Sequence, residues 1–409
     1  MRILILTQYF PPETGAPQNR LYDLALKLEE KGAEVSILTA FPNYPKYEIF
    51  PGYAGKWYAR EAMGPLEVHR SWIYVSKRKS MVFRLLNYFS FTLSSLLAGW
   101  WKVGKTDLII CESPPLFLGF TAVCLKRLKG AKLVFNVSDL WPESAVKLDL
   151  IKNKTLIRLS TKLEEWIYRN SDKISGQTQG IIHDIQSRFP AKPIFWLKNG
   201  VDTAELQARI TGYDWRTAQG FEKSDLLFYF GGLIGYAQGL DCILHAAVRL
   251  KHHADVKFIL VGDGPDKARL LALKAELNAD NVYFFDGVSK KEIADVIAAM
   301  DVGIIPLKKI DLFLGAIPSK IFEILCLKKP LLLGIEGEAK DIFIRDAQAG
   351  LAFEPENGDA LAEQIQYLLD HRPLIGEMGE NGHNFVAEHF NRAVIARDFW
   401  AFIDGPVPR

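Results

Sequence analysis

The chain has 409 residues, of which 49% are hydrophobic and 24% charged, and its formal net charge is +2. This length exceeds the size at which a single hydrophobic core stops growing, so two domains are expected. The balanced composition excludes a disordered chain, and a net charge near zero makes nucleic-acid binding a poor interpretation.

The opening residues predict a βαβ unit. Residues 2–7 form an apolar run, which we interpret as a first strand rather than a signal peptide, and a loop rich in Pro and Gly follows over residues 8–19. A helix is expected over 20–31 and a second strand over 35–39. Gly15 and Ala16 lie in the loop after the first strand, where α/β sheets bind ligands, so the backbone there can approach a phosphate. A simple turn is an equally good interpretation.

The segment 70–106 is basic and aromatic. It contains no acidic residue, and its cations alternate with aromatic side chains, a pattern that suits an anionic membrane surface. Residues 81–101 are long enough to cross a membrane, but Arg84, Asn87 and several Ser and Thr residues interrupt the apolar run. The alternative is an ordinary core helix.

Further strands are expected over 107–111, 132–136, 173–175 and 193–197, with helices over 116–128 and 156–169. After the strand 132–136 come Asp139 and Glu143, with Trp141 between them. Two carboxylates at the carboxyl end of a strand are candidates for acid/base chemistry or for binding hydroxyl groups. The alternative is that Asp139 caps the next turn and Trp141 packs in the core.

The second half repeats the alternation of strand and helix. After a polar stretch over 203–224, expected to be a linker, strands are predicted over 226–230, 257–261, 282–285 and 302–305. Gly231-Gly232 and Gly262-Asp263-Gly264-Pro265 follow the first two of these strands. Glycine turns between strand and helix are typical of phosphate-binding loops.

Residues 318–323, Pro-Ser-Lys-Ile-Phe-Glu, are predicted to open a helix after a loop. Ser319 is able to cap the first amides, and the free N–H groups of a helix start favour a diphosphate. Lys320 would add a positive charge beside them. Glu323 lies one turn further, where a carboxylate reaches the sugar hydroxyls of a nucleotide.

The pattern as a whole predicts an α/β protein with two doubly wound Rossmann-like domains facing across a cleft. The first domain is expected over 1–202 and the second over 203–384. A C-terminal helix, about 385–409, is expected to return to the first domain, or else to contact another subunit. Four cysteines stand far apart, with no Cys/His cluster and no Asp-x-Asp, so we expect reduced thiols and no bound metal or other cofactor.

The whole chain resembles the family-4 retaining glycosyltransferases of GT-B fold, and most closely the bacterial O-antigen and capsule enzymes of the L-fucosamine (N-acetyl-L-fucosamine) transferase type. The segments that carry the resemblance occur in family order from end to end: QYFPPETGAPQNRL, FNVSDLWPESA, the turn 198–202, Gly231-Gly232-Leu233 with Gln238-Gly239, VGDGP, FDGVSKKE, DVGIIPL and PSKIFEILCLKKP.

The resemblance implies roles for the donor site. Glu323 matches the second glutamate of the family's Glu-x7-Glu signature, which holds the donor ribose, while the first glutamate would fall at Gly315 and is missing. The family's Arg and Lys that grip the donor diphosphate would fall at Gly232 and Gln238, and neither is basic here. Lys320, with Ser319 and nearby amides, is then the expected cation for that diphosphate.

Three further pairs of residues follow from the resemblance. Gly287 and Val288 match the seat of the uracil ring, and Gly15 and Ala16 match the first-domain loop that closes on the donor. Ser138-Asp139 replaces the family's common His-Asp. We expect Asp139, Glu143 and Lys320 to be the catalytic residues.

The implied activity is a metal-independent hexosyltransferase reaction in O-antigen, lipopolysaccharide or capsule synthesis. The donor would be a UDP-sugar, such as one carrying an N-acetylated 6-deoxyhexose, and the acceptor a polyprenyl-diphosphate-linked saccharide. We expect a peripheral protein on the inner face of the bacterial cytoplasmic membrane, held there by residues 70–106. A UDP-sugar 2-epimerase and an inactive nucleotide-sugar-binding subunit remain alternatives.

Overall fold

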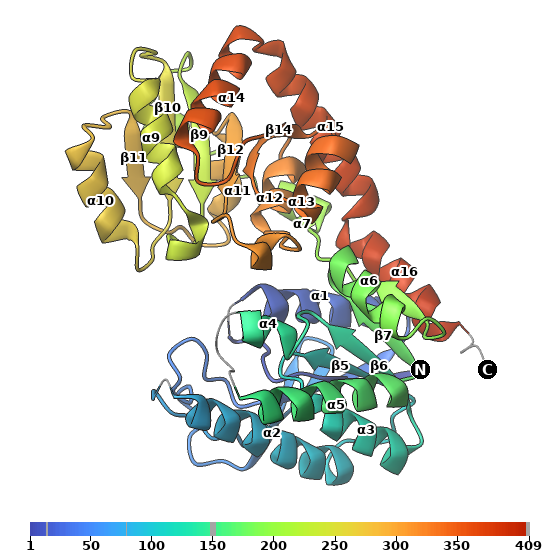
Figure 1. Ribbon diagram of the computed structural model, residues 1–409. Helices are drawn as coiled ribbons and strands as arrows, with labels where there is room; N and C mark the ends of the chain where they lie inside the picture. The colour runs from blue at the N-terminus through green and yellow to red at the C-terminus, as the bar shows by residue number, and fades with distance from the viewer. Residues whose placement is uncertain (14, 79, 148–152, 406–409) are drawn as a thin grey trace. The chain divides into compact units, whose positions relative to one another are not determined.

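The computed structural model describes residues 1–13, 15–78, 80–147 and 153–405, and the chain divides into two compact units. Unit 1 contains Met1–Asn199 together with Arg392–Arg409, and unit 2 contains Gly200–Asn391. The division therefore falls a few residues before the expected position 202, and the chain returns to unit 1 at Arg392 rather than at about 385. Figure 1 shows both units as layers of helices around a sheet.

Unit 1 is built on an eight-stranded sheet in the order β3-β4-β2-β1-β5-β6-β7-β8. All neighbours are parallel except β3 and β4, which form an antiparallel hairpin at one edge. The strands are β1 (Arg2–Leu6), β2 (Glu34–Ala40), β3 (Tyr58–Met63), β4 (Leu66–Ser71), β5 (Leu108–Ser113), β6 (Lys132–Val137), β7 (Lys173–Gly176) and β8 (Ile194–Trp196). The expected strands are present, but the sequence did not predict the hairpin.

Helices cover both faces of this sheet. The helices of unit 1 are α1 (Ala16–Glu30), α2 (Met81–Trp101), α3 (Leu118–Lys129), α4 (Glu143–Lys147), α5 (Lys154–Asn170), α6 (Gln179–Arg188) and α16 (Arg392–Asp404). Ile3 and Ile5 of β1 pack in a core with α1 and α16, whereas Leu4 and Leu6 pack in a second core with α2, α3 and α5. This alternation is the period of two that a strand imposes on its side chains.

The return of the C-terminal helix to the first domain is confirmed. Phe399 of α16 is fully buried and packs with Phe195 of β8, with ring centroids 5.5 Å apart. Arg392, the first residue of α16, forms an ion pair with Asp23 of α1. Helix α16 is therefore part of the first core.

Unit 2 is built on a six-stranded parallel sheet in the order β11-β10-β9-β12-β13-β14. Its strands are β9 (Leu226–Gly231), β10 (Val256–Val261), β11 (Val282–Phe285), β12 (Val302–Pro306), β13 (Leu331–Gly334) and β14 (Gly350–Ala352). The chain reverses its direction of winding between β11 and β12, so β9 and β12 lie next to each other at a topological switch point, where doubly wound sheets bind ligands.

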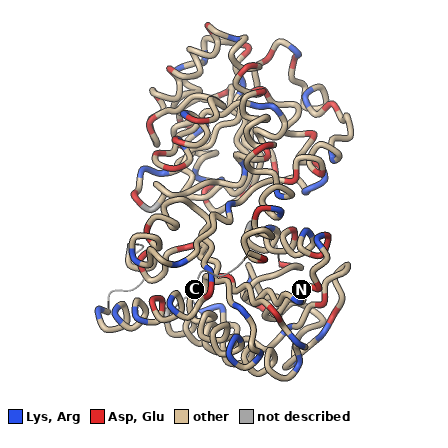
Figure 2. Tube along the Cα trace, turned by 90° about the vertical axis from the view of Figure 1, so that its right-hand side faces the viewer, with Lys and Arg blue, Asp and Glu red and all other residues tan. Residues whose placement is uncertain are grey.

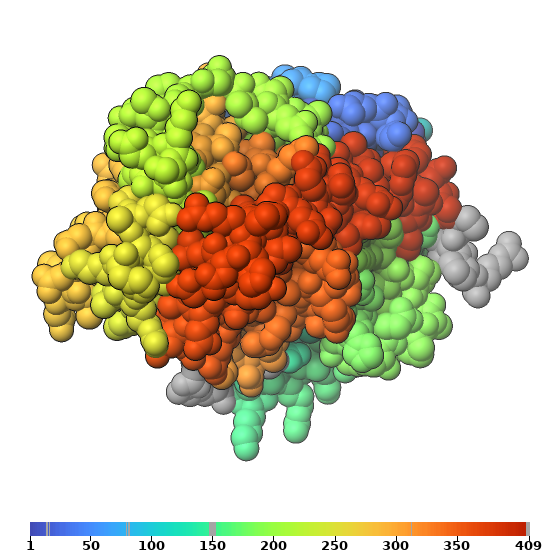
Figure 3. Space-filling model, turned by 90° about the horizontal axis from the view of Figure 1, so that it is seen from above, coloured from blue at the N-terminus to red at the C-terminus, as the bar shows by residue number. Residues whose placement is uncertain are grey.

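The helices of unit 2 are α7 (Thr203–Ala208), α8 (Trp215–Ala218), η1 (Tyr236–Gln238), α9 (Asp241–Arg249), α10 (Lys267–Glu276), α11 (Ile293–Ala298), η2 (Asp311–Phe313), α12 (Lys320–Cys326), α13 (Glu338–Lys340), η3 (Asp341–Asp346), α14 (Gly358–Asp370) and α15 (Pro373–His389). α14 packs against α9, and Figure 3 shows the orange-red surface of α14 beside the yellow surface of the α9–α10 region.

The prediction of a polar linker over 203–224 was wrong. This stretch contains α7 and α8 and belongs to unit 2, with Trp215 and Phe221 both buried. Trp215 packs edge-on against Phe285 at the end of β11, with ring centroids 5.0 Å apart. The segment is therefore part of the second domain's core, and two aromatic residues in a polar surrounding were the signal.

Candidate active site

In unit 2 the carboxyl ends of β9, β10 and β11 lie close together through glycine. The Gly232 amide donates to Val261 O over 2.9 Å, and the Gly262 amide donates to Phe285 O over 3.0 Å. A Cβ atom on Gly262 would stand 1.9 Å from Gly232 O, and Gly262 has a positive φ of 154°. Only glycine at position 262 lets the two backbones lie this close. We call the closely packed backbone of Gly232 and Gly262, at the ends of β9 and β10, the ledge.

Lys320 brings its amine to the same ledge. Nζ lies 3.9 Å from the centroid of the Phe230 ring in β9, and a Cβ atom on Gly232 would be 3.4 Å from it. Within the described part of the chain Lys320 forms no ion pair. Burial lowers the pKa of the amine to about 8, and nearby Glu323 partly opposes this shift. The amine is thus a desolvated cation beside the β9 turn.

Ser319 occupies the N-cap position of α12, but it does not cap the helix. Its side chain makes no capping hydrogen bond and its backbone is already helical, with φ −61° and ψ −25°. The expectation that this hydroxyl binds the first amides was therefore wrong. The amides of Ile321 and Phe322 donate instead to Pro318 O and Ser319 O, over 3.1 and 3.2 Å.

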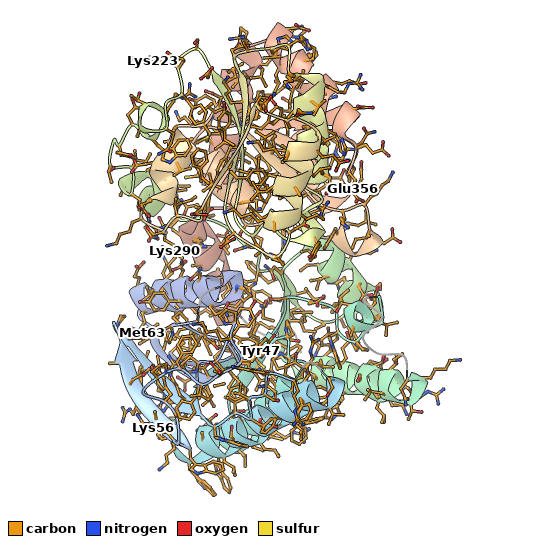
Figure 4. All side chains as sticks on the ribbon, turned by 90° about the vertical axis from the view of Figure 1, so that its left-hand side faces the viewer. Tyr47, Lys56, Met63, Lys223, Lys290 and Glu356 are labelled. Carbon is orange, nitrogen blue, oxygen red and sulfur yellow. The ribbon has the colours of Figure 1, made fainter. Side chains whose placement is uncertain are left out.

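Glu323 lies one turn along α12 among positive charges. Burial raises the pKa of its carboxyl, and Arg209, Lys290 and Lys320 act in the opposite direction. Arg209 follows α7 and also donates to Lys290 O over 3.4 Å. Lys290, labelled in Figure 4, lies in the loop after β11. Neither Arg209 nor Lys290 was among the residues expected at the donor site, although Lys290 lies in the turn between β11 and α11.

The other expected donor residues are placed as follows. A Cβ atom on Gly287 would lie 3.9 Å from the Gly262 Cα, so Gly287 belongs to the same ledge, and Val288 next to it is 36% exposed. Gln238 ends η1, and its amide donates to Gly235 O over 3.0 Å within that turn. That contact does not join Gln238 to Lys320. Gly315 lies in the loop before α12.

In unit 1 Gly15 is the N-cap of α1 and Ala16 is its first residue. Gly15 has an extended backbone, with φ 171°, and the Gln18 side chain covers it: a Cβ atom there would be 2.4 Å from Gln18 Oε1. The loop therefore leaves no room for a larger residue without displacing Gln18.

Asp139 and Glu143 lie on either side of the turn after β6. Ser144 Oγ donates to Asp139 Oδ2 over 2.9 Å, and burial raises the pKa of the Asp139 carboxyl, with the charge of Glu143 adding to the shift. Glu143 begins α4. Trp141 packs edge-on against Phe117, with ring centroids 5.4 Å apart. The turn thus packs through Trp141 and also carries two carboxylates, of which Glu143 acts electrostatically on Asp139.

The basic aromatic segment is less uniform than expected. Arg70 is fully buried at the end of β4, where it pairs with Glu61 of β3 and donates to Pro11 O over 2.5 Å, so it adds no surface charge. Phe91 is also in the core. Lys79 lies outside the described residues. Figure 2 shows basic and acidic residues interspersed along the traces of both units.

The outer side of α2 does present large apolar side chains to solvent, namely Val82, Leu86, Phe89, Leu93, Leu97, Trp100 and Trp101. A shallow pocket of about 330 Å³ lies beside it, lined by Trp57, Trp72, Leu93, Leu97, Trp101 and Lys102. No described helix is long and apolar enough to cross a membrane. No three His, Cys, Asp or Glu side chains gather into a metal-binding group in the described ranges.

Two family models match the chain. Residues 15–200 match the glycosyl transferase 4-like domain, and residues 213–385 match the glycosyl transferases group 1 domain. Among curated proteins, the chain is 27% identical over 385 residues to the colanic acid biosynthesis glycosyl transferase WcaI of Escherichia coli K12, covering 90% of this chain and 92% of that protein. It is 23% identical over 262 residues to the O-antigen chain mannosyltransferase C of Escherichia coli, covering 60% and 66%.

Among solved structures, HepE from Anabaena in complex with UDP-glucose has the same fold, with a TM-score of 0.68 and 17% identity over 99% of both chains. The two matched domains, in this order, account for both units of the structure. The chain therefore contains a glycosyl transferase 4-like domain followed by a glycosyl transferases group 1 domain, and it has the GT-B fold.

Proposed function

We propose that the protein is a retaining, metal-independent glycosyltransferase of bacterial surface-polysaccharide synthesis. It would move a sugar from a UDP-sugar, bound by unit 2, to a saccharide linked to polyprenyl diphosphate, bound by unit 1. The relatives support this proposal: one is described as a colanic acid enzyme, another as an O-antigen mannosyltransferase, and the UDP-glucose complex of HepE shares the fold.

The observation that carries the proposal is the amine of Lys320 beside the β9 ledge. In sugar transfer from a nucleotide diphosphate, negative charge builds on the leaving diphosphate. A desolvated cation and backbone amides stabilise that charge most when they are already in place. Lys320 supplies the charge that Gly232 and Gln238 lack.

The remaining residues have separate roles in the proposed reaction. Glu323 binds the ribose hydroxyls, Gly287 and Val288 seat the base, and Asp139 with Glu143 orients the acceptor hydroxyl. Because Gly315 provides no carboxylate, a donor sugar that lacks the corresponding hydroxyl, such as a deoxy or amino sugar, fits best. The raised pKa of Asp139 suits a group that exchanges a proton with the acceptor.

The acceptor side is proposed to meet the membrane through α2. Its exposed Leu, Phe and Trp side chains enter the interface, while Arg84, Lys102 and Lys105 face anionic head groups. The protein would then be peripheral on the cytoplasmic face of the inner membrane, where lipid-linked saccharides are assembled.

The test is a panel of UDP-sugars incubated with undecaprenyl-diphosphate-GlcNAc, with products read by mass spectrometry. The proposal expects one donor to yield a glycolipid heavier by one sugar residue, with the anomeric configuration of the donor retained. Epimerised donor formed without any acceptor would identify a 2-epimerase instead. Donor binding without transfer to any lipid acceptor would identify a binding subunit.

A further inference from the structure

A second polar cluster in unit 1 has no role in the reaction as described so far. Arg20 on the second turn of α1 forms an ion pair with Glu112 of β5, Nη2 to Oε1 at 2.6 Å, and the two side chains are only 7% and 4% exposed. The same Nη2 donates to Ser138 Oγ over 2.9 Å. The cluster thus joins α1 to the turn that follows β6.

The remaining bonds fix Ser138 in one orientation. Asn136 Nδ2 donates to Glu112 Oε2 over 2.7 Å, and Ser175 Oγ donates to Asn136 Oδ1 over 2.7 Å. Ser138 Oγ forms a short hydrogen bond to Glu112 Oε1. Since Nη2 of Arg20 can only donate, the single hydroxyl proton of Ser138 goes to the carboxylate. The Ser138 hydroxyl is therefore directed toward the buried Arg20–Glu112 pair and fixes the start of the turn to it.

The next residue in the chain is Asp139, which is held from the other side by Ser144. Ser138 thus connects the turn to a buried ion pair, and Asp139 connects it to Ser144 of α4. Arg20 also lies five residues after Gly15 on the helix that Gly15 opens. A single guanidinium group therefore fixes both the helix behind the Gly15 loop and the turn that carries Asp139.

Burying the Arg20–Glu112 cluster has a free-energy cost for the fold. Arg20 Nε and Nη1 are buried and have no hydrogen-bond partner among the described residues. A buried donor left unpaired costs about 1–3 kcal/mol, and a buried ion pair can often be replaced by apolar side chains without loss of stability. Polar arrangements that break such rules are concentrated at functional sites.

We propose that Arg20 and Glu112 are positioning residues for glycosyl transfer, which hold Asp139 in place through Ser138. The assignment rests on the proposed function, since Asp139 is the group taken to orient the acceptor. Neither Arg20 nor Glu112 needs to touch a substrate. Their contribution is to keep the carboxylate of Asp139 at a fixed place relative to the Gly15 loop within unit 1.

The test compares wild type with Arg20→Met/Glu112→Leu, which replaces the ion pair by apolar side chains of similar size. Turnover, thermal unfolding, donor affinity by calorimetry and amide hydrogen exchange of residues 138–147 are measured. We expect a melting temperature within a few degrees of wild type and unchanged donor affinity. Turnover should fall at least 30-fold, and exchange in 138–147 should be at least tenfold faster.

Two further variants keep the test decisive if the double variant does not fold. Ser138→Ala removes only the anchoring hydroxyl and should lower turnover about tenfold with little effect on unfolding. Arg20→Lys keeps a charge and a donor and should restore turnover to within about fivefold of wild type. The control is Arg188→Met/Glu164→Leu, which removes another ion pair of unit 1, with Glu164 5% and Arg188 31% exposed, and should leave turnover of the folded protein unchanged.

Folded Ser138→Ala or double variants with wild-type turnover and unchanged exchange in residues 138–147 would overturn the proposal. So would a fall in turnover that merely follows the loss of folded protein, as in the control pair. Hydrogen exchange does not depend on turnover. If wild type transfers no sugar, the proposed function fails, while the exchange data still decide whether the ion pair holds the turn.

Discussion

The amine of Lys320 lies next to Gly232, so close that a Cβ atom on the glycine would stand 3.4 Å from Nζ. Gly232 is where the sequence resemblance expects an arginine, and its φ of 120° is one that residues with a side chain rarely adopt. Lys320 of α12 thus places its amine in the space that a side chain at position 232 would use. This pairing is the basis of the donor-site predictions.

The first prediction is that Lys320→Met weakens UDP binding by about 10- to 100-fold, because a charge-assisted hydrogen bond contributes about 1.5–3 kcal/mol. Binding of uridine, which has no phosphate, should change less than threefold. Calorimetry measures both. Lys328→Met is the control, since Lys328 is exposed just past the other end of α12 and pairs with Glu380. Equal losses for UDP and uridine would show a general disturbance of the site instead.

The second prediction concerns pH. The pKa of Lys320 is about 8 in the free protein against an ordinary value of 10.5, and a bound diphosphate raises it again. UDP affinity should therefore be constant below pH 8 and fall above it, by at most tenfold per pH unit. Lys320→Arg, which stays charged, should bind UDP equally from pH 7 to 9.5.

The lowered pKa of Lys320 affects the stability of the fold in the opposite direction: UDP affinity falls above pH 8, whereas stability rises. Between pH 8 and 10.5 the unfolded chain binds more protons at Lys320 than the folded chain does, so this residue makes the free energy of unfolding rise with pH. Lys320→Arg should remove that contribution.

For the binding prediction, a wild-type UDP affinity that does not change between pH 7 and 9.5 would contradict the assignment of Lys320 to the diphosphate.

The third prediction concerns Glu323. Wild type should prefer UDP to 2′,3′-dideoxy-UDP by at least tenfold, because the carboxylate accepts hydrogen bonds from the ribose. Glu323→Gln should reduce this preference to a few-fold, mainly by weakening UDP. Glu336→Gln is the control, as Glu336 pairs with Lys340 at the surface. If Glu323→Gln weakened both nucleotides equally, the carboxylate would have a structural role among Arg209, Lys290 and Lys320.

The fourth prediction concerns α2. Leu93→Glu/Leu97→Glu places charge on two side chains that are 61% and 49% exposed, so the fold should tolerate it. Partitioning onto vesicles with anionic lipid should fall at least tenfold, because apolar area no longer enters the interface. Leu271→Glu on unit 2 is the control. Wild-type sedimentation that is insensitive to anionic lipid and to salt would rule out this membrane surface.

Much of the fold follows from local sequence. Parallel strands are buried on both faces, so apolar runs such as 2–7 and 226–230 predict strands, and Gly232 and Gly262 were recognisable as parts of strand-to-helix turns. The hairpin of β3 and β4 was missed because its strands carry Arg60, Glu61 and Glu67, which pair across the edge rather than form an apolar run.

The candidate sites depend on contacts between distant parts of the chain. The sequence marks Lys320 as the start of a helix, but its position over Phe230 and beside Gly232 comes from the neighbouring arrangement of β9 and β12. The bond between Arg20 and Glu112 joins residues 92 positions apart. No spacing within a single element encodes such contacts, although a carboxylate at the end of β5 was a usable signal.

The most direct test of the central claim is the turnover of Lys320→Met at saturating donor, with the donor and lipid acceptor found in the panel of UDP-sugars. If Lys320 stabilises the leaving diphosphate, turnover should fall by about 10²–10³, as for the loss of one preorganised oxyanion donor, and Lys320→Arg should recover part of it. Turnover of Lys320→Met equal to that of wild type, once donor is saturating, would contradict the claim.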